Sequence, residues 1–367
     1  MARTIEARKS DRPTVADVAA AAGVSVATVD RVINGRLPVR AKTAQRVKTA
    51  AEEVGFHAKI LISHRLADER PQMRFGFMLQ RHSEQFYRAF GNALEHATRS
   101  SDSFSGDPLV EYLDDLRPAH VAERLRELAA KVDAVGLVAA DHPYINKAIS
   151  ELRENGKAVV ALLSDLSAPA RAGYVGMDWR KMGRTAGWAM ARLAHGSGRV
   201  VIIVGSHRYL ATEVCEISFQ TYLRENATHL QLLEPLVNFE EPRLAYQATL
   251  DMLQKAKDLV GIYMVGGGVE GVMEALRESG AAKRVTTVCH DLTDDTRLGL
   301  VDGVLDLVMH QPRPLMASAA VSTMFSAARV LRSKAATNAD GPSESAASNH
   351  VPQSTVIPFE LYSAENI

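Results

Sequence analysis

Cysteine is scarce in this chain of 367 residues, which has only Cys215 and Cys289. Two cysteines cannot form a disulfide framework, so we expect two buried free thiols in a reducing compartment. Long apolar runs are missing too. The longest, residues 158–163 and 200–204, have the length of strands, whereas a membrane helix needs about 20 apolar residues. The N-terminal residues have no signal-peptide core. We therefore expect a cytoplasmic protein with no membrane partner.

An excess of charge of one sign is also absent, because 43 Lys and Arg balance 43 Asp and Glu. This balance hides an asymmetry. Residues 1–70 contain 13 Lys and Arg against 8 Asp and Glu, so they carry a net charge of +5 and the remainder carries −5. A basic segment joined to an acidic body suggests that only the basic segment meets a polyanion.

The basic segment predicts three short helices. Thr14 is a good N-cap for the first helix, and Asp17 can complete a capping box. Gly23 ends this helix, because glycine adopts positive φ at little cost. Ser25 caps a second helix that extends to about residue 34. A third helix is expected over about residues 40–54.

Two short helices joined through Ala-Gly-Val-Ser form a helix-turn-helix pattern, whose second helix lies in the major groove when it binds DNA. Helical spacing divides the second helix into an inward stripe of Val29, Val32 and Ile33 and an outward face of Val26, Ala27, Asp30 and Arg31. From the helices alone, a helical pair with no DNA role is as good an interpretation.

The residues themselves favour DNA binding. Residues 14–35 read T-V-A-D-V-A-A-A-A-G-V-S-V-A-T-V-D-R-V-I-N-G. This segment closely resembles the head of the lac-repressor-type (LacI/GalR) transcription regulators, whose pattern is roughly T-x-x-D-V-A-x-x-A-G-V-S-x-x-T-V-S-R-x-x-N. The one clear departure is Asp30 in place of Ser. The resemblance continues through Val39 to Phe56, and it implies a homodimer whose two heads bind the halves of a near-palindromic operator in double-stranded DNA.

The resemblance also implies roles for single residues. Val26 and Ala27 stand at the positions that choose bases, where small apolar groups can contact thymine methyls, and Arg31 stands where a guanine contact is plausible. The positions that contact phosphates and fix the register are Ser25, Thr28 and Asn34. Thr14 is counted with the DNA-binding residues as the cap of the first helix. For Asp30 we favour an ion pair with Arg31 over a contact with cytosine.

A hinge follows the head in this family, and its leucine enters the minor groove. Its usual form is Pro-Asn-x-x-Ala-x-x-Leu. Residues 56–66 lack the Pro-Asn pair, and the leucine that best fits, Leu66, comes one residue late. We therefore expect a head over residues 1–56 and a hinge and linker over residues 57–72, with a hinge of altered register.

From residue 73 onward, short apolar runs alternate with amphipathic helical stretches, which predicts an α/β fold with parallel sheets covered by helices. About ten strands suggest two doubly wound lobes. We expect lobe 1 over about residues 73–177 and 306–335, and lobe 2 over about residues 178–305 and 336–367. Residues 338–353 are rich in Ala, Ser, Asn and Pro and read as a flexible insertion between the lobes.

Ligands of such sheets bind at the carboxyl ends of the strands, so the cleft between the lobes is the natural site. The body resembles the LacI/GalR core, which is similar to type I periplasmic sugar-binding proteins. This resemblance implies a small polar effector, a sugar or polyol. An aromatic pair that can stack on a sugar, together with carboxylates and amides that can bind its hydroxyls, gives the candidate effector residues: Phe86, Tyr87, Asp141, Asp178, Asp291 and Gln311. Cys215 occupies the position of the family's effector-binding arginine, so Arg208 is the candidate replacement.

Three other functions are alternatives to a ligand-controlled repressor. For an enzyme, such as a sugar-active enzyme on the same core, the sequence offers no nucleophile elbow, no paired metal spacing and only a weak glycine-rich signal at residues 266–271. A free solute-binding protein would need a signal peptide and would have no helix-turn-helix. An activator, or a regulator that needs a corepressor, stays open beside the favoured repressor. We expect no catalytic residues, no metal and no cofactor, and a dimer rather than a tetramer.

Overall fold

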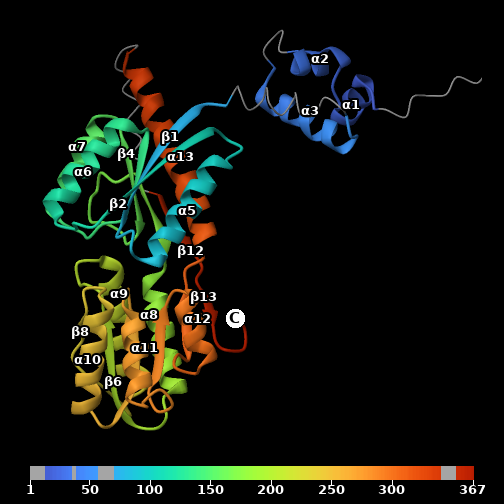
Figure 1. Ribbon diagram of the computed structural model, residues 1–367. Helices are drawn as coiled ribbons and strands as arrows, with labels where there is room; N and C mark the ends of the chain where they lie inside the picture. Colours follow the sequence, from blue (N-terminus) through green and yellow to red (C-terminus); the bar gives the residue numbers. More distant parts are fainter. Residues whose placement is uncertain (1–12, 35–38, 57–69, 340–352) are drawn as a thin grey trace, which may run out of the picture. The chain divides into compact units, whose positions relative to one another are not determined.

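The computed structural model describes residues 13–34, 39–56, 70–339 and 353–367 (Figure 1). The chain divides into two compact units, which we call the head unit (Met1–Met73 with Ser101–Gly106) and the core unit (Arg74–Ser100 with Asp107–Ile367). Leu66 and the rest of the expected hinge at residues 57–69 lie outside the described residues, as does most of the expected interlobe insertion.

The head unit contains three helices, α1 (Val15–Ala22), α2 (Val26–Asn34) and α3 (Ala41–Glu53). Thr14 and Asp17 form the expected capping box, in which the Asp17 carboxylate accepts from the Thr14 N–H at 2.7 Å. Gly23 ends α1 with a φ of 62°, and the Ser25 Oγ accepts from the Thr28 N–H at 3.2 Å at the start of α2. The predicted helices and caps are confirmed.

A small apolar core holds the three helices together. Its largest members are Val18 from α1, Val29 and Val32 from α2, Val47 from α3, and Phe56. All five are buried, which removes their side chains from water and stabilises the helix-turn-helix. Ile33, predicted on the same stripe, packs against this core with partial burial. The inward stripe predicted for α2 is thus confirmed.

The core unit is built from two α/β lobes, one above the other in Figure 1. The sheet of lobe 1 has the strand order β12-β5-β4-β3-β1-β2. Its strands are β1 (Gln72–Gln80), β2 (Ser105–Leu113), β3 (Ala134–Leu137), β4 (Ala158–Leu163), β5 (Gly173–Met177) and β12 (Gln353–Ile357). Its helices are α5 (Gln85–Arg99), α6 (Pro118–Lys131), α7 (Pro143–Glu154) and α13 (Arg313–Ala339).

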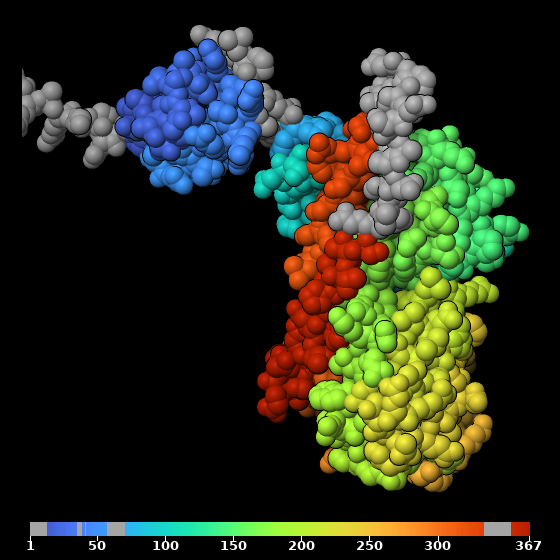
Figure 2. All heavy atoms as spheres, turned by 180° about the vertical axis from the view of Figure 1, so that it is seen from behind, coloured from blue at the N-terminus to red at the C-terminus, as the bar shows by residue number. Residues whose placement is uncertain are grey.

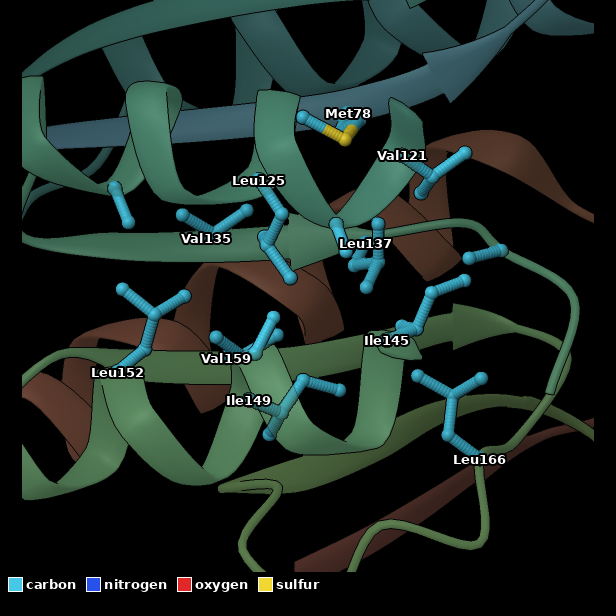
Figure 3. Packing of buried hydrophobic residues seen from close by; sticks show 14 of the residues in the cluster. Met78, Val121, Leu125, Val135, Leu137, Ile145, Ile149, Leu152, Val159 and Leu166 are labelled. Carbon is cyan, nitrogen blue, oxygen red and sulfur yellow. The ribbon is translucent and has the colours of Figure 1, made fainter. Parts of the chain in front are cut away.

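Figure 3 shows how α6 and α7 cover one face of this sheet, with Leu125 beside Val135 and Ile149 beside Val159. The strands β3 and β4 are buried along their whole length. This full burial explains their continuous apolar sequences, as expected for parallel strands covered on both faces.

The sheet of lobe 2 has the order β13-β11-β10-β9-β6-β7, and β8 also pairs with β6. Its strands are β6 (Gly198–Val204), β7 (Leu230–Leu232), β8 (Leu236–Val237), β9 (Leu259–Val265), β10 (Thr286–His290), β11 (Leu307–His310) and β13 (Glu360–Tyr362). Its helices are α8 (Trp179–Leu193), α9 (Leu210–Asn226), α10 (Pro242–Lys255), α11 (Val269–Glu278) and α12 (Asp294–Val301). The two lobes confirm the predicted α/β fold with doubly wound sheets.

Two details of the prediction were wrong. The single strand expected over residues 230–237 is two short strands, β7 and β8, separated by a segment that contains Pro235, which has no N–H to donate to a sheet. The lobe boundaries also differ, because β11 pairs with β10 in lobe 2, whereas β12 pairs with β5 in lobe 1. The chain therefore crosses between the lobes after β11 and again after β12, and Figure 2 shows its C-terminal residues, in red, along the edge of both lobes.

One helix within the described ranges, α13 at residues 313–333, is long and apolar enough by composition to cross a membrane. In the fold it packs on α5 and on strands β3, β4 and β5 of lobe 1. Its residues Met316, Ala320 and Met324 are buried there. The helix thus has the contacts of a core helix.

Candidate functional site

The outward face of α2 presents a short row of exposed side chains. Val26 is 51% exposed, and Ala27, Asp30, Arg31 and Asn34 are exposed as well. Val26 and Ala27 offer small apolar surfaces, and Arg31 offers the planar donors that suit a guanine edge. At the start of the helix, the hydroxyls of Ser25 and Thr28 share a hydrogen bond of 2.9 Å.

Asp30 does not form the expected ion pair with Arg31. Its carboxylate accepts from the side-chain amide of Asn34 at 2.6 Å, one helical turn further on. Among the residues that the structure describes, no ion pair joins Asp30 to Arg31. A residue four positions along a helix lies on the same face, whereas the next residue points about 100° away, which explains the choice of partner. The pairing leaves the Arg31 guanidinium free of Asp30.

Arg46 of α3 has a structural role that the sequence did not reveal. Its guanidinium donates to the carbonyl oxygens of Ala22 and Gly23, which form the turn between α1 and α2. A methyl group at Gly23 would lie 3.0 Å from the Arg46 Nη2, and the φ of Gly23 is positive. Arg46 and Gly23 together therefore fix the angle between the two helices.

A cavity of about 560 Å³ lies between the two lobes of the core unit. This volume is in the range of small-molecule sites, about 300–1,000 Å³. Its wall is formed by residues at strand ends of both lobes, and four of the candidate effector residues belong to it: Phe86, Tyr87, Asp291 and Gln311.

Aromatic and amide side chains form a polar connection through the cavity wall. The Tyr87 hydroxyl donates to the Gln80 Oε1 at 3.3 Å, and the Gln80 Nε2 donates to the Tyr209 hydroxyl at 2.7 Å. This chain of bonds joins lobe 1 to lobe 2. His290 shares a hydrogen bond of 2.7 Å with the Tyr263 hydroxyl, and burial lowers the pKa of His290 to about 4, so it is neutral near pH 7. Trp179 and Phe86 add ring surfaces to the wall.

The backbone of Asp291 has a φ of 65°, a left-handed conformation that residues other than glycine rarely adopt. Its two carboxylate oxygens accept from the Gln311 Nε2 at 3.2 and 3.1 Å. Burial raises the pKa of Asp291 to about 6, although the nearby Arg313 opposes this shift. Three other positive-φ residues with side chains, Arg81, Leu163 and Glu240, also belong to the cavity wall. Strained backbone of this kind tends to occur at ligand-binding sites.

Three of the candidate effector residues lie outside the cavity wall. Asp178 caps α8, where its carboxylate accepts from the Lys181 N–H at 3.0 Å. Asp141 accepts from the Ser167 N–H at 3.0 Å and from Asn146, and it fixes a loop of lobe 1. Arg208 is exposed, and its carbonyl oxygen accepts from the Asp141 N–H at 3.1 Å. In this structure the contacts of the two carboxylates are with nearby backbone and side-chain groups, so a role of these three residues in ligand binding stays a prediction.

The cysteines are buried free thiols, as expected. Cys215 lies inside lobe 2, with its Sγ 3.5 Å from the Tyr263 hydroxyl, and burial raises its pKa to about 12. It does not contribute to the cavity wall, so the position held by arginine in the resembling family has become part of the core. Arg208 does not replace that arginine in the cavity.

Seven charged residues of the wall are not among the predicted effector residues: Arg81, Glu84, Arg88, Glu240, Glu241, Glu270 and Asp295. Burial and the neighbouring Glu240 raise the pKa of Glu84 to about 7, and burial also raises the pKa of Glu240. Glu84 follows β1 and was passed over in favour of the aromatic pair beside it. Glu240 follows β8, so the rule that ligands sit at strand ends would have found it.

Two family profiles match the chain. The profile described as "Periplasmic binding protein domain" matches residues 75–330, and the one described as "Bacterial regulatory proteins, lacI family" matches residues 14–59. A relative, an uncharacterized HTH-type transcriptional regulator in the aml 5' region of Streptomyces limosus, is 26% identical over 334 residues. The match covers 85% of this chain and 87% of the relative.

Solved structures of similar fold include solute-binding proteins. An ABC transporter solute binding protein from Agrobacterium vitis with bound alpha-D-tagatopyranose has a TM-score of 0.68 at 14% identity, covering 80% of this chain and 95% of its own. The arabinose binding protein AraP from Geobacillus stearothermophilus has a TM-score of 0.63 at 18% identity, covering 81% of this chain and 98% of its own. At these identities the likeness shows the fold.

Proposed function

Because the chain belongs to the periplasmic binding protein domain family and carries a lacI-family DNA-binding head at residues 14–59, we propose that this DNA-binding transcription regulator is a ligand-controlled repressor. One observation carries this proposal: an exposed recognition helix and a polar interlobe cavity occur in the same chain. Ligand binding in the cavity can then change the DNA affinity of the head.

The ligand that we propose for the cavity is a sugar or polyol. Phe86 offers a ring face to the C–H face of a sugar, and Asp291 and Gln311 offer acceptors and donors for its hydroxyls. The structures of similar fold include proteins with bound tagatose and arabinose binding proteins, which supports this class of ligand. Tyr87 supports the site through its bond to Gln80.

Control of DNA affinity requires that the ligand favour one arrangement of the lobes. Several polar contacts join the lobes around the cavity. The Gln85 Nε2 donates to the Asp294 carboxylate at 3.1 Å, and the Ala211 N–H donates to the Ser164 Oγ at 3.2 Å. A ligand that replaces or strengthens such contacts changes the angle between the lobes. This change in turn alters the hinge that precedes the core and so the affinity of the heads for DNA.

The remaining parts of the proposal concern the assembly. Two copies form a homodimer, so that two heads bind the half-sites of a near-palindromic operator. The base-reading residues are Val26, Ala27 and Arg31, while Thr14, Ser25, Thr28 and Asn34 support phosphate contacts. The protein acts in the cytoplasm, where its operator is, without catalysing a reaction.

The test combines ligand binding with DNA binding. Pentoses, hexoses and polyols are first screened for those that raise the unfolding temperature of the full chain. Fluorescence anisotropy then measures the affinity for a duplex selected from random DNA, with and without each stabilising ligand. We expect a change of about 5- to 150-fold, with weaker binding for a repressor released by its ligand. Stronger binding would identify a corepressor or an activator mechanism. A stabilising ligand that leaves the DNA affinity unchanged would contradict ligand control.

A further inference from the structure

The wall of the interlobe cavity is strongly acidic. Its carboxylates outnumber its guanidinium groups by six to two, and no lysine belongs to the wall. The acids are Glu84, Glu240, Glu241, Glu270, Asp291 and Asp295, and the bases are Arg81 and Arg88. The hydroxyls of a neutral sugar carry no charge, so they cannot balance this excess of acids.

Two of these acids converge from opposite lobes. Glu84 follows β1 of lobe 1, and Glu240 follows β8 of lobe 2. A methyl group placed on Gly267 would lie 3.1 Å from the Glu84 Oε2 and 3.2 Å from the Glu240 Cβ. The Glu240 carboxylate itself lies beside the neighbouring glycine, because a methyl group placed on Gly266 would lie 3.1 Å from the Glu240 Oε1. The two acids therefore line the same glycine loop. Burial and the charge of Glu240 raise the pKa of Glu84 to about 7, as expected for carboxylates in close proximity.

The positive groups near these acids are already engaged with the protein. The Arg81 Nη1 lies 3.7 Å from the Glu84 Oε1, and the same nitrogen donates to the Phe239 carbonyl at 3.3 Å. Arg88 donates to the carbonyl oxygens of His82 and Ser83 at 2.7 and 2.5 Å. His290 is neutral, because burial lowers its pKa to about 4. Arg313 lies outside the wall and lowers the pKa of Asp291, but its guanidinium donates to the Leu292 carbonyl at 3.4 Å and lies 5.9 Å from the centre of the Phe86 ring. The protein's own cations therefore only partly balance the acids.

An independent observation comes from Gln311, which is 5% exposed. Its Nε2 donates to the Asp291 carboxylate, whereas its Oε1 is buried without a hydrogen-bond partner. A buried acceptor without a donor costs free energy. Since Gln311 belongs to the cavity wall, a bound ligand with an N–H or O–H group could donate a hydrogen bond to its Oε1.

We propose that the ligand of this cavity is a hydroxylated amine, such as an amino sugar, whose ammonium group lies between Glu84 and Glu240 and whose hydroxyls reach Asp291 and Gln311. This inference rests on the proposed function, in which the cavity binds the effector. An ammonium between two partly buried carboxylates relieves their mutual repulsion and gains charge-assisted hydrogen bonds from both. The ring surfaces of Phe86 and Trp179 suit the apolar face of such a ligand.

Other charged ligands fit less well. A sugar acid or sugar phosphate would meet the acids and would find no uncommitted cation in the wall. A metal ion is disfavoured by the geometry, because within the described part of the chain no three His, Cys, Asp or Glu side chains converge closely enough to hold one. The acidic wall is therefore better matched to an organic cation.

The test is a matched comparison of amines with their neutral parents, by isothermal titration of the full chain. The probes are D-glucosamine, D-galactosamine, D-mannosamine and 1-amino-1-deoxysorbitol, each with the hydroxyl parent and, for the sugars, the N-acetyl derivative. We expect at least one amine to bind at least about thirtyfold more tightly than both neutral forms, as for loss of one partner of a buried charge pair. Glu84→Gln and Glu240→Gln should each remove most of this preference.

The control variant is Glu154→Gln, which makes the same change in charge at an exposed position of α7 and should leave the preference intact. Thermal unfolding of each variant establishes that it is folded. Neutral parents that bind as tightly as the amines, or a chain that binds no probe of either series, would overturn the amine assignment. The regulator function does not depend on this result, because it is tested separately by DNA binding.

Discussion

In the head unit, the exposed side chains that we propose to read bases lie within the nine residues of α2, whereas the cavity wall of the core unit comes from positions between residues 81 and 311. Helical periodicity alone places Val26 and Arg31 on one face. The cavity instead depends on which strand ends meet across two sheets. A mutation in α2 should thus affect a single DNA contact. A mutation in the cavity should instead affect the coupling between effector binding and DNA affinity.

The largest expected effect is in the cavity. Asp291→Ala and Asp291→Asn should abolish the change in operator affinity caused by the effector, because Asp291 supplies the carboxylate beside Gln311. Operator binding without effector should persist. Asn tolerates the positive φ of this position better than Ala, so agreement between the two variants excludes backbone strain as the cause. Anisotropy on a selected duplex measures the response, and a normal response in both variants would remove Asp291 from the site.

The second prediction concerns the pH dependence of stability. The folded chain keeps a proton on Glu84 up to about pH 7, because of burial and the charges of Glu240 and Glu270, which Arg81 only partly offsets. The unfolded chain releases this proton near pH 4.5. The free energy of unfolding should therefore fall as pH rises through this window, by up to about 3 kcal/mol. Asp291 adds a shift of the same sign.

Urea unfolding followed by tryptophan fluorescence measures this effect in the core unit, because both tryptophans, Trp179 and Trp188, belong to lobe 2. Glu84→Gln should make the profile flatter and raise stability at neutral pH. A profile of unchanged slope in this variant would show that the Glu84 carboxyl is solvated rather than held in the cavity.

The third prediction concerns base recognition by α2. Arg31→Ala should cost about 1–3 kcal/mol of discrimination between the selected duplex and one with a changed guanine. The loss should concentrate on one base-pair position, since Arg31 is exposed and is not paired with Asp30. Anisotropy with a series of single-base duplexes resolves this. An equal loss on every duplex would assign Arg31 to the phosphates instead.

A smaller effect is expected at the cap of α1. Thr14→Ala removes the hydroxyl that accepts from the Asp17 N–H, and it should destabilise the head by about 1 kcal/mol. Hydrogen exchange of head peptides in the full chain measures this locally. Peptides of the core unit serve as the internal control. Unchanged exchange in the head would mean that the capping box contributes little to its stability.

The smallest effect is expected for Arg208→Ala, which should leave the effector response unchanged. The Arg208 side chain is exposed and lies outside the cavity wall, and its contact with Asp141 is made by its backbone carbonyl. The same anisotropy assay applies, with Asp291→Ala as the positive control. A lost response would show that Arg208 enters the cavity in another arrangement of the lobes.

The sequence predicted the head almost completely, because its caps, turn and apolar stripe are local features of about forty residues. It also predicted most strands of the core, because their short apolar runs are typical of buried parallel strands. The lobe assignment of β11 and β12 failed, because strand pairing between distant segments leaves no local signal. The position of Asp178 could not be predicted for a different reason. A carboxylate after a strand can serve as a helix cap or as a ligand contact, and in this structure Asp178 caps α8.

The acidic character of the cavity could not be read from single motifs. Glu84 and Glu240 are separated by more than 150 positions, and only the fold brings both to Gly267. Their pKa shifts arise from this meeting and from burial, neither of which appears in the composition. A site formed by residues from two lobes therefore cannot be predicted from the sequence alone, whereas a site on one helix can.

The most direct test of the account is selection of bound sequences from random duplex DNA by the full chain, carried out at two salt concentrations. The account predicts a palindromic motif of two half-sites that survives at the higher salt, because base contacts from α2 add to phosphate contacts. Binding without a consensus that collapses steeply with salt would show that only phosphates are recognised. That result would contradict the central claim that this chain is a sequence-specific regulator.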